Sequence, residues 1–240
     1  MRTLPCSAAL IVVLALSACG TGAENDRAAA DAVTAMYAAR TEAASRFTPE
    51  RSLGDLLTNR WFAVDGKDPA PLTAGIVVGV VKEVRPGKAY VAPGEGATAK
   101  EVAFDDSAAL WRTATLVLSV SERIGFSDPA SSLDLAVPIN GELPFEDFRA
   151  GVVAMGSVVA VLDHREPGAP YGIHWDGAYL APVAEDGSFK FTGLGGEAEA
   201  LQSGMDTLAE LREESARPPV VIVTDGSGED RSEPTPAAAE

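Results

Sequence analysis

The chain has very little cysteine and histidine for its 240 residues. Its two cysteines, Cys6 and Cys19, both lie in the first twenty residues, so the rest of the chain contains no thiol for a disulfide or a cysteine metal site. No Gly-x-Ser-x-Gly segment supplies a serine nucleophile on a sharp turn. The folded part must therefore be held together by its apolar core, and roughly 150 residues are enough to build one without cross-links.

Basic residues are also scarce. The chain has 19 Lys and Arg against 35 Asp and Glu, a net charge of −16 at pH 7. An acidic surface of this size repels phosphate backbones and anionic lipid headgroups. We therefore predict that nucleic acid is not a partner, and that charge does not draw the folded body onto a membrane.

Long apolar runs are missing as well. The run from Ala8 to Leu16 is too short for a membrane-spanning helix, which needs about 20 residues. Arg2 before it and the small residues Ser17 and Ala18 after it complete the layout of a secretory signal peptide. The segment Leu16-Ser17-Ala18-Cys19 then resembles the lipobox of bacterial lipoproteins, in which the cysteine thiol is alkylated with diacylglycerol and the signal is removed in front of it.

This resemblance covers residues 1 to about 20, and no family is recognised for the mature domain. It implies a protein anchored to the cell membrane through lipid on Cys19 and facing outside the cytoplasm. Each buried methylene contributes about 0.8 kcal/mol, so two acyl chains hold stably where one holds marginally. Removal of residues 1–18 takes away only Arg2 among the charged residues, which leaves 18 basic against 35 acidic residues and a net charge of −17. The alternatives are an ordinary signal peptide with a chance cysteine and a membrane-spanning helix.

Composition divides the chain into five segments. We predict a signal peptide at 1–18, a lipidated tether at 19–25, a helical and extended lead-in at 26–71, a β-rich domain with a closing helix at 72–216, and a mostly disordered acidic tail at 217–240. The lead-in begins with an Ala-rich helix whose larger apolar residues recur near helical spacing, and Thr48-Pro49 ends it. A short helix and an extended segment follow it around Leu53 to Phe62.

The domain at 72–216 carries the signals of short strands. Residues 111–121 alternate between apolar and polar side chains, which is typical of a strand with one face in a core. Thr73 to Val84, the turn Arg85-Pro86-Gly87 and Lys88 to Val91 together predict a hairpin. Pro144 to Ala150 predicts one helical turn. Further strands are predicted at Leu133–Ile139, Ser157–Asp163, Tyr171–Trp175, Ala178–Val183 and Ser188–Phe191.

The predicted fold is therefore mainly β, in the β-rich α+β class, with a single small antiparallel barrel or sandwich. It has an N-terminal Ala-rich helix and a C-terminal helix from Leu201 to Ala216, with Ser203 or Asp206 available as N-cap. The tail beyond is rich in Gly, Ser, Pro and acidic residues, which is typical of disorder. Val220 to Val223 is the exception, and the sequence leaves open whether it is a strand.

One cluster has residue types that bind metal. Asp163, His164, Glu166, His174 and Asp176 include both histidines of the chain and lie within fourteen residues around a Pro-Gly turn. If the two segments pair as neighbouring strands, two imidazoles and one or two carboxylates form a usable zinc set. The alternative is that these are polar residues of a loop and of strand ends.

Other motifs are weaker. Gly193-Leu194-Gly195-Gly196 lacks the spacing of a phosphate-binding loop, and the acidic residues at 225–230 lack the glycine and glutamate positions of a calcium loop. The three tryptophans, Trp61, Trp111 and Trp175, would form a sugar-stacking platform if they shared an exposed face, although core positions are commoner for tryptophan.

The leading functional hypothesis is a membrane-anchored envelope lipoprotein that acts as a non-catalytic binding or interaction module, with no cofactor and with an envelope protein or a small ligand as partner. The alternative is a small metal-binding protein or metal-dependent hydrolase that uses the cluster at 163–176. A third hypothesis, the solute-binding component of an importer, shares the lipobox but needs two α/β lobes, and the strand-helix alternation they require is missing.

Overall fold

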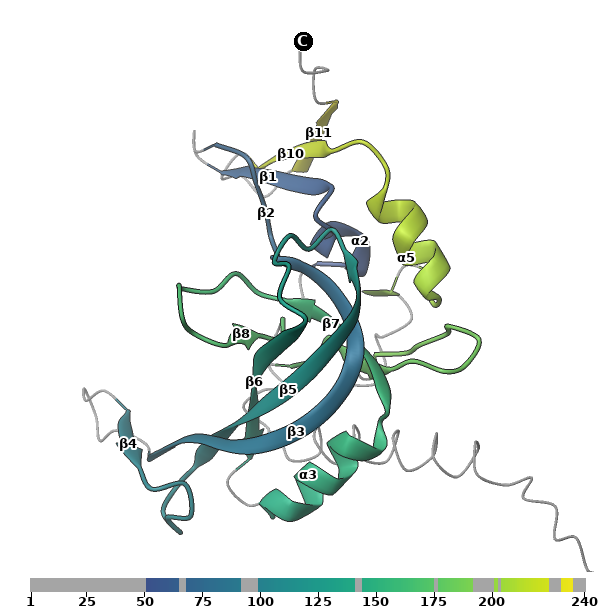
Figure 1. Ribbon diagram of the computed structural model, residues 1–240. Helices are drawn as coiled ribbons and strands as arrows, with labels where there is room; N and C mark the ends of the chain where they lie inside the picture. Colours follow the sequence, from purple (N-terminus) through teal and green to yellow (C-terminus); the bar gives the residue numbers. More distant parts are fainter. Residues whose placement is uncertain are drawn as a thin grey trace, which may run out of the picture.

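The computed structural model describes residues 51–64, 68–91, 99–140, 144–174, 177–191, 201–202, 204–224 and 230–234, by backbone only at 64, 140, 224 and 230–234 (Figure 1). The predicted lipobox, tether and Ala-rich helix, together with Trp175 and Asp176, lie outside these residues. The elements are α2 (Leu53–Leu56), β1 (Arg60–Val64), β2 (Ala70–Pro71), β3 (Gly75–Val91), β4 (Lys100–Val102), β5 (Trp111–Ile124), β6 (Ser132–Asn140), α3 (Phe145–Ala154), β7 (Ser157–Leu162), β8 (Tyr171–Gly172), β9 (Leu180–Pro182), α5 (Leu208–Ser215), β10 (Val220–Thr224) and β11 (Asp230–Pro234).

The main body is a seven-stranded sheet with the order β8-β6-β5-β3-β7-β9, and β4 pairs with β3 beside this path. Its long strands pair antiparallel, and only the short β6–β8 pair is parallel. Figure 1 shows that β3 and β5 curl strongly, so that the sheet forms part of a barrel. The predicted β-rich α+β fold is confirmed.

The alternation predicted for β5 is present. Ala114, Leu116 and Leu118 are completely buried, whereas the residues between them are half-buried. Their side chains face an apolar cluster that also contains Phe148 and Val152 of α3, so this helix covers the inner side of the curled sheet. The same period of two therefore sets both the strand and its buried face.

The first part of β3 is buried on both faces. Val77 and Val81 belong to the apolar cluster that α3 covers. Ile76 and Val78 face a second cluster, which includes Leu211 of α5 and residues of α2. A strand covered on both sides needs a continuous apolar run rather than an alternation. This double burial explains the run of Val and Ile at 76–81.

The predicted hairpin at 85–91 is wrong, because β3 continues as one strand from Gly75 to Val91. Its register with β5 shifts between Pro86 and Ala89, where the extra residues form a bulge. Pro86 is tolerated because β3 pairs with β7 only up to Val80 and with β4 only from Ala89 onward, which leaves one edge of β3 unpaired between them. Gly87 is required there, because a Cβ would lie 2.5 Å from Thr113 Oγ1.

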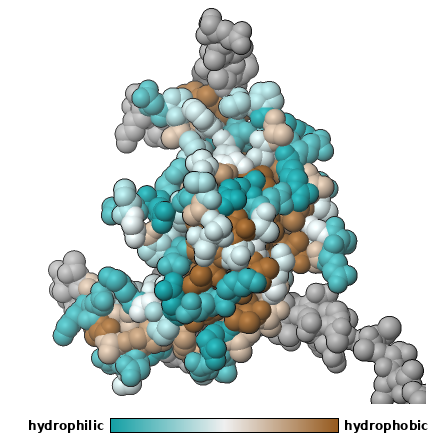
Figure 2. Space-filling view, in the orientation of Figure 1, coloured by the Kyte–Doolittle hydropathy of each residue, from teal (hydrophilic) through white to brown (hydrophobic). Residues whose placement is uncertain are grey.

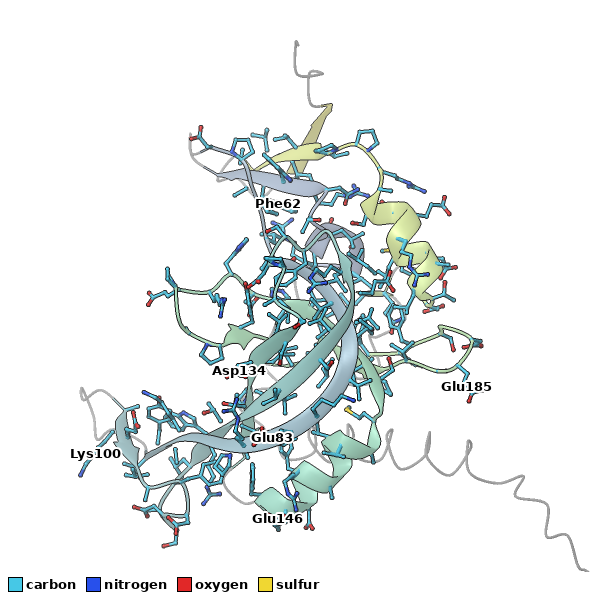
Figure 3. The ribbon with its side chains drawn as sticks, in the orientation of Figure 1. Phe62, Glu83, Lys100, Asp134, Glu146 and Glu185 are labelled. Carbon is cyan, nitrogen blue, oxygen red and sulfur yellow. The ribbon has the colours of Figure 1, made fainter. Side chains whose placement is uncertain are left out.

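A second sheet of four strands has the order β11-β10-β1-β2. Figure 1 shows it at the end of the molecule opposite α3, and Figure 3 places Phe62 in it, far from Glu146 of α3. Its central pair is parallel, with Arg60 opposite Val220 and Phe62 opposite Ile222. Val220 to Val223 is therefore a strand, and the described part of the segment at 217–240 contains β10 and β11. No local pattern reveals the parallel pairing of β10 with β1, because the two strands lie far apart in the sequence.

The predicted closing helix is present as α5 but begins at Leu208, although Leu201 and Gln202 are themselves helical. Its N-cap is Thr207 rather than Asp206, and Ser203 lies outside the described residues. Thr207 has an extended backbone and pairs in a bridge with Ser188, which stops the helix from extending further back. The Glu210 N–H donates to Thr207 Oγ1, and the Glu210 carboxylate accepts from the Thr207 N–H, which together form a capping box. The helical turn predicted at Pro144–Ala150 extends to Ala154 as α3.

Candidate ligand-binding site

The two segments that carry the predicted metal cluster do pair antiparallel. The Asp163 N–H donates to the Gly172 carbonyl at 2.9 Å, and the His174 N–H donates to the Val161 carbonyl at 2.8 Å. Asp163 and His174 therefore project on one face, and their side chains meet with His174 Nδ1 2.5 Å from Asp163 Oδ1.

His164 lies elsewhere. It is one residue beyond Asp163, so the alternation of the strand turns its ring away from His174, and His164 Nε2 lies 3.0 Å from the carbonyl oxygen of Pro71. Glu166 is exposed on the turn. Within the described ranges no group of three or more His, Cys, Asp or Glu side chains is placed to hold a metal ion, and Asp176 lies outside those ranges.

A pocket of about 380 Å³ lies where the second sheet meets one end of the curled sheet. We call it the Trp61 pocket. One wall comes from the second sheet, with Trp61 and Pro71, and from Thr58 in the turn before it. The other wall comes from two segments of the main body, at 125–127 and 164–171. Its volume lies within the usual range of small-molecule sites, about 300–1,000 Å³.

Trp61 presents the largest aromatic face at this pocket. Its indole N–H donates to the Thr58 carbonyl at 2.8 Å, and the side chain is 38% exposed. Gly125 makes the close approach of the two walls possible. Its φ is +62°, and a Cβ at this position would collide with the hydroxyl of Thr58. The seam between the two sheets therefore depends on a glycine.

The floor of the pocket contains Phe126 and Tyr171. Their rings meet edge to face, with centroids 5.2 Å apart, and both side chains are buried. The Arg165 guanidinium lies over the Tyr171 ring, 4.0 Å from its centroid. Arg165 also donates to the Ala169 carbonyl at 2.7 Å, so its long side chain is held in one position.

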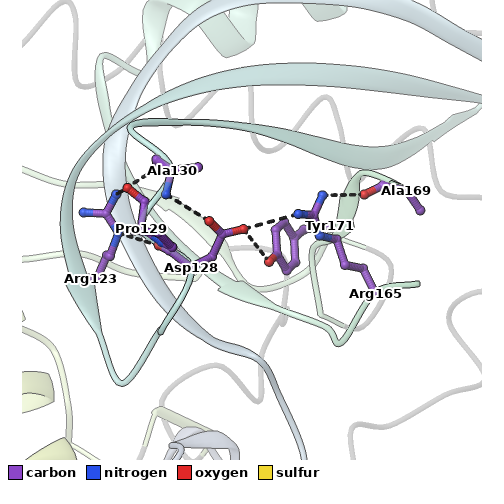
Figure 4. A network of polar contacts seen from close by, with 7 residues as sticks. All are labelled: Arg123, Asp128, Pro129, Ala130, Arg165, Ala169 and Tyr171. Carbon is purple, nitrogen blue, oxygen red and sulfur yellow. Dashed lines mark hydrogen bonds and ion pairs between the residues drawn. The ribbon is translucent and has the colours of Figure 1, made fainter. Parts of the chain in front are cut away.

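Asp128 joins these groups into the network drawn in Figure 4. Its Oδ2 accepts from the Tyr171 hydroxyl at 2.9 Å and from Arg165 at 3.2 Å, and its Oδ1 accepts from the Ala130 N–H at 2.9 Å. The bond from Ala130, then the bond from Tyr171 and the neighbouring arginines, lower the pKa of Asp128. Burial, together with the bond to Asp128, raises the pKa of Tyr171.

Arg123 holds the loop behind Asp128. Its guanidinium donates to the carbonyl oxygens of Asp128, Pro129 and Ala130 at 2.8, 3.1 and 2.7 Å (Figure 4). Three carbonyls on one guanidinium give a loop a single conformation without regular secondary structure. This wall of the pocket is therefore held in place by hydrogen bonds within the loop itself.

His164 also lines the Trp61 pocket. A carbonyl oxygen only accepts hydrogen bonds, so the contact with Pro71 assigns the proton to Nε2. In the tautomer with its hydrogen on Nε2, Nδ1 is an acceptor. The described chain has a second hollow of about 450 Å³ at the C-terminal end of α3, lined by Met155, Phe189, Lys190 and Asp206, but Phe189 is buried and presents no open ring face there.

The hypothetical sugar-stacking platform of three tryptophans does not form between Trp61 and Trp111, the two that the structure describes. Trp111 stacks on Tyr90, with centroids 5.8 Å apart, in the part of the sheet next to β4. Figure 1 shows β4 and β1 at opposite ends of the molecule. Figure 2 shows hydrophobic side chains scattered among hydrophilic ones on one face of the body.

Sequence reasoning missed the residues that build the Trp61 pocket. Arg123, Asp128 and Tyr171 were assigned to strands or passed over, and nothing in their spacing joins them, because they meet only when β8 packs beside the 125–131 loop. The one signal was Gly125 followed by Asp128-Pro129, which marks a turn but not a site.

Comparison of the chain with protein-family models, with curated proteins and with solved structures found no match. In the part of the chain that the structure describes, no helix combines the length and the apolar character needed to cross a bilayer.

Proposed function

We propose that this protein is a lipid-anchored, non-catalytic binding module of the bacterial cell envelope, with the Trp61 pocket as its ligand site. The lipobox-like segment ending in Cys19 supports the anchor and the position outside the cytoplasm. The observation that carries the binding role is the pocket itself, in which two sheets bring an open aromatic face and several polar groups to one preformed hollow.

The titratable groups around the pocket favour binding over catalysis. General acid–base catalysis works best with a group whose pKa lies near the working pH. The pKa of Asp128 is lowered and that of Tyr171 is raised, so both move away from neutrality. At pH 7 Asp128 is ionised, Tyr171 is protonated, and their hydrogen bond serves to hold the wall of the pocket.

The metal-dependent alternative has less support. A catalytic zinc site needs three protein ligands and an open position. Asp163 and His174 supply two neighbouring groups, whereas His164 contacts Pro71 on the other side of the strand. A zinc site here would need a third ligand from outside the described residues or a rearrangement of this segment.

The anchor is tested with the two cysteines. Cys19→Ala should prevent lipidation and signal removal, so that a larger precursor accumulates and does not incorporate a labelled fatty acid. Cys6→Ala is the matched control, because Cys6 lies within the predicted signal and should leave labelling and size unchanged. If the wild-type protein takes up no label in growing cells, the anchor is refuted.

The ligand site is tested with a library of small-molecule fragments and a ¹⁵N-labelled sample of the mature protein. We expect shift changes to gather at the pocket, around Thr58, Gly125 and Arg165. Fragments that bind only at the hollow beside Lys190 would refute the Trp61 pocket as the ligand site and assign that role to the hollow. A library with no binder at either place would count against a binding module.

A further inference from the structure

We infer that the Trp61 pocket recognises a neutral saccharide unit, which stacks on Trp61 and is held by hydroxyl and imidazole groups. This inference rests on the proposed function, because it names the chemical class of ligand for the same pocket. The pocket contains polar groups that already have hydrogen-bond partners and others that remain free to bind a ligand, and the free groups indicate the class of ligand.

The free feature of Trp61 is its ring face. Its only polar atom already donates to the Thr58 carbonyl, and this bond fixes the indole at the mouth of the pocket. A partner of Trp61 must therefore offer C–H groups to the negative face of the ring. The apolar face of a pyranose ring does this, since its axial C–H bonds are positively polarised by the neighbouring oxygens.

The pocket carries no unbalanced charge. The guanidinium of Arg165 is 3.2 Å from the carboxylate of Asp128, and its other bond goes to a backbone carbonyl. An anionic ligand would have to compete with Asp128 for this guanidinium, and it would also approach a protein with a net charge of −16. A cationic ligand finds Asp128 already bonded by Tyr171, Arg165 and Ala130. Neutral ligands are therefore favoured.

The remaining polar groups suit hydroxyls. Within the described structure, the side-chain hydroxyls of Thr58 and Ser127 line the pocket and have no hydrogen-bond partner. His164 keeps Nδ1 as an acceptor once Nε2–H donates to Pro71. The hydroxyl of Thr73, in contrast, already donates to the Leu56 carbonyl. A ligand that both donates and accepts at several points satisfies this set, and sugar hydroxyls do both.

The test is a titration of the full-length mature lipoprotein, held in an amine-oxide detergent because glucoside and maltoside detergents carry sugar headgroups. The probes are N-acetylglucosamine and glucose. Adenosine tests a flat aromatic ring, glucose 6-phosphate tests an anion, and cyclohexanol tests a saturated ring with a single hydroxyl. The readout is the indole N–H resonance of Trp61, assigned by its loss in Trp61→Ala.

We expect at least one of the two sugars to bind with a Kd of about 1 mM, in the range of weak single-site ligands, and to shift the Trp61 resonance. Trp61→Ala should weaken binding at least tenfold, and Ser127→Ala should weaken it severalfold without affecting the fold, because Ser127 is exposed. Trp111→Ala is the matched control, since Trp111 is 37% exposed and lies in the other sheet, next to β4. It should leave the affinity within twofold.

Three results would overturn the saccharide assignment. If adenosine shifts Trp61 and the sugars do not, the ligand is a flat ring and the binding role stands. If glucose 6-phosphate binds far more tightly than glucose, the pocket selects an anion. If none of these probes shifts Trp61 while library fragments still bind there, only the saccharide class fails, whereas loss of both signals refutes the proposed function as well.

Discussion

The seven-stranded sheet and the four-stranded sheet differ in what covers them. The first part of β3 has apolar clusters on both faces, built from α3 on one side and from α2 and α5 on the other. In the second sheet, Phe62 and Ile222 are the buried side chains among those described, and they lie directly opposite each other in register. The other described side chains of β1 and β10 are half-buried or exposed.

This difference separates the part of the molecule that supplies stability from the part that carries the proposed ligand site. The large sheet buries most of the apolar area and therefore supplies most of the free energy of folding. The second sheet depends on backbone pairing and on one buried contact, and it carries Trp61 at the mouth of the pocket. Binding residues commonly lie on less stable elements that a rigid scaffold positions.

Charged pairs repeat this contrast. On the large sheet, Arg85 contacts both Glu83 and Asp134, which Figure 3 labels, and all three side chains are well exposed. Such pairs contribute little, about 0–1 kcal/mol. Near the second sheet, the Arg60–Glu214 pair is less exposed, and Asn59 donates to the Glu214 carbonyl at 2.7 Å. The Arg60–Glu214 pair is therefore more shielded from water than the pairs made by Arg85.

The comparison is tested most strongly by matched truncations of apolar side chains in the two sheets. Leu116→Ala removes a completely buried side chain from the large sheet and should lower the free energy of unfolding by about 2–5 kcal/mol. Val221→Ala, on the half-buried second sheet, should cost less than about 1 kcal/mol. Urea unfolding measures both, and equal costs would refute the division between the sheets.

Removal of the distant strand is expected to have the next largest effect. A chain ending at Pro219 lacks β10 and β11, so Phe62 loses its contact with Ile222 and β1 loses its central partner. The free energy of unfolding should fall by about 1.5–3 kcal/mol, the value of one buried isoleucine. Hydrogen exchange should rise in β1 but not in β5.

A chain ending at Pro234 is the control for this truncation, and it should retain the stability of the full-length protein. If the chain ending at Pro219 is equally stable, then β10 contributes nothing to the folded state. If β5 loses its protection as well, the two sheets unfold as one unit.

The smallest expected effect concerns α5, which joins the two regions. Its Leu211 is buried in the core of the large sheet, and β10 follows it in the chain. Thr207→Ala removes the N-cap and should lower the free energy of unfolding by about 1 kcal/mol, while Thr207→Ser should retain most of it. Thermal unfolding of the three proteins measures the difference.

The same cap predicts a pH dependence. The Thr207 hydroxyl, followed by the backbone N–H groups of Asp206 and Thr207, lowers the pKa of Glu210 from its ordinary value of 4.5. A carboxylate whose pKa is lowered by folding stabilises the folded state at pH values above its ordinary pKa. This stabilisation is lost as the pH falls from 4.5 toward the lowered pKa. Thr207→Ala should therefore lose less stability than the wild type over that acidic window. An identical pH profile for both proteins would contradict the role of the cap.

Much of the large sheet could be predicted from local pattern. The alternation at 111–121 predicts β5 and its buried face correctly, because a strand in contact with one core needs apolar side chains at every second residue. The proline and glycine at 86 and 87 were misleading, since they are typical of a turn, whereas in the structure they form a bulge where the pairing of β3 with β5 skips Thr113. The local sequence shows which residues favour a bend, but not whether pairing with the neighbouring strand makes that bend a turn or a bulge.

The candidate site was almost entirely hidden from the sequence. The metal cluster was proposed from residue types close together in the chain, and the strands did pair, but the one-residue step from Asp163 to His164 reverses the side chain. The Trp61 pocket joins three segments that lie far apart in the sequence, at 58–74, 125–127 and 164–171. Its parts are ordinary aromatic, hydroxyl and charged residues with no common spacing.

The sequence by itself determined the β-rich class, the positions of β5, β6 and β7 and the end of the closing helix, because these depend on side-chain periodicity and on residues that restrict the backbone. Only the tertiary structure decided that Val220 lies beside Arg60 and that Trp61 faces Tyr171 and His164 across a pocket. Strand pairing between distant segments is selected by the free energy of the whole packed chain. A local sequence pattern predicts where strands occur, whereas the register between distant strands is set only when the core forms.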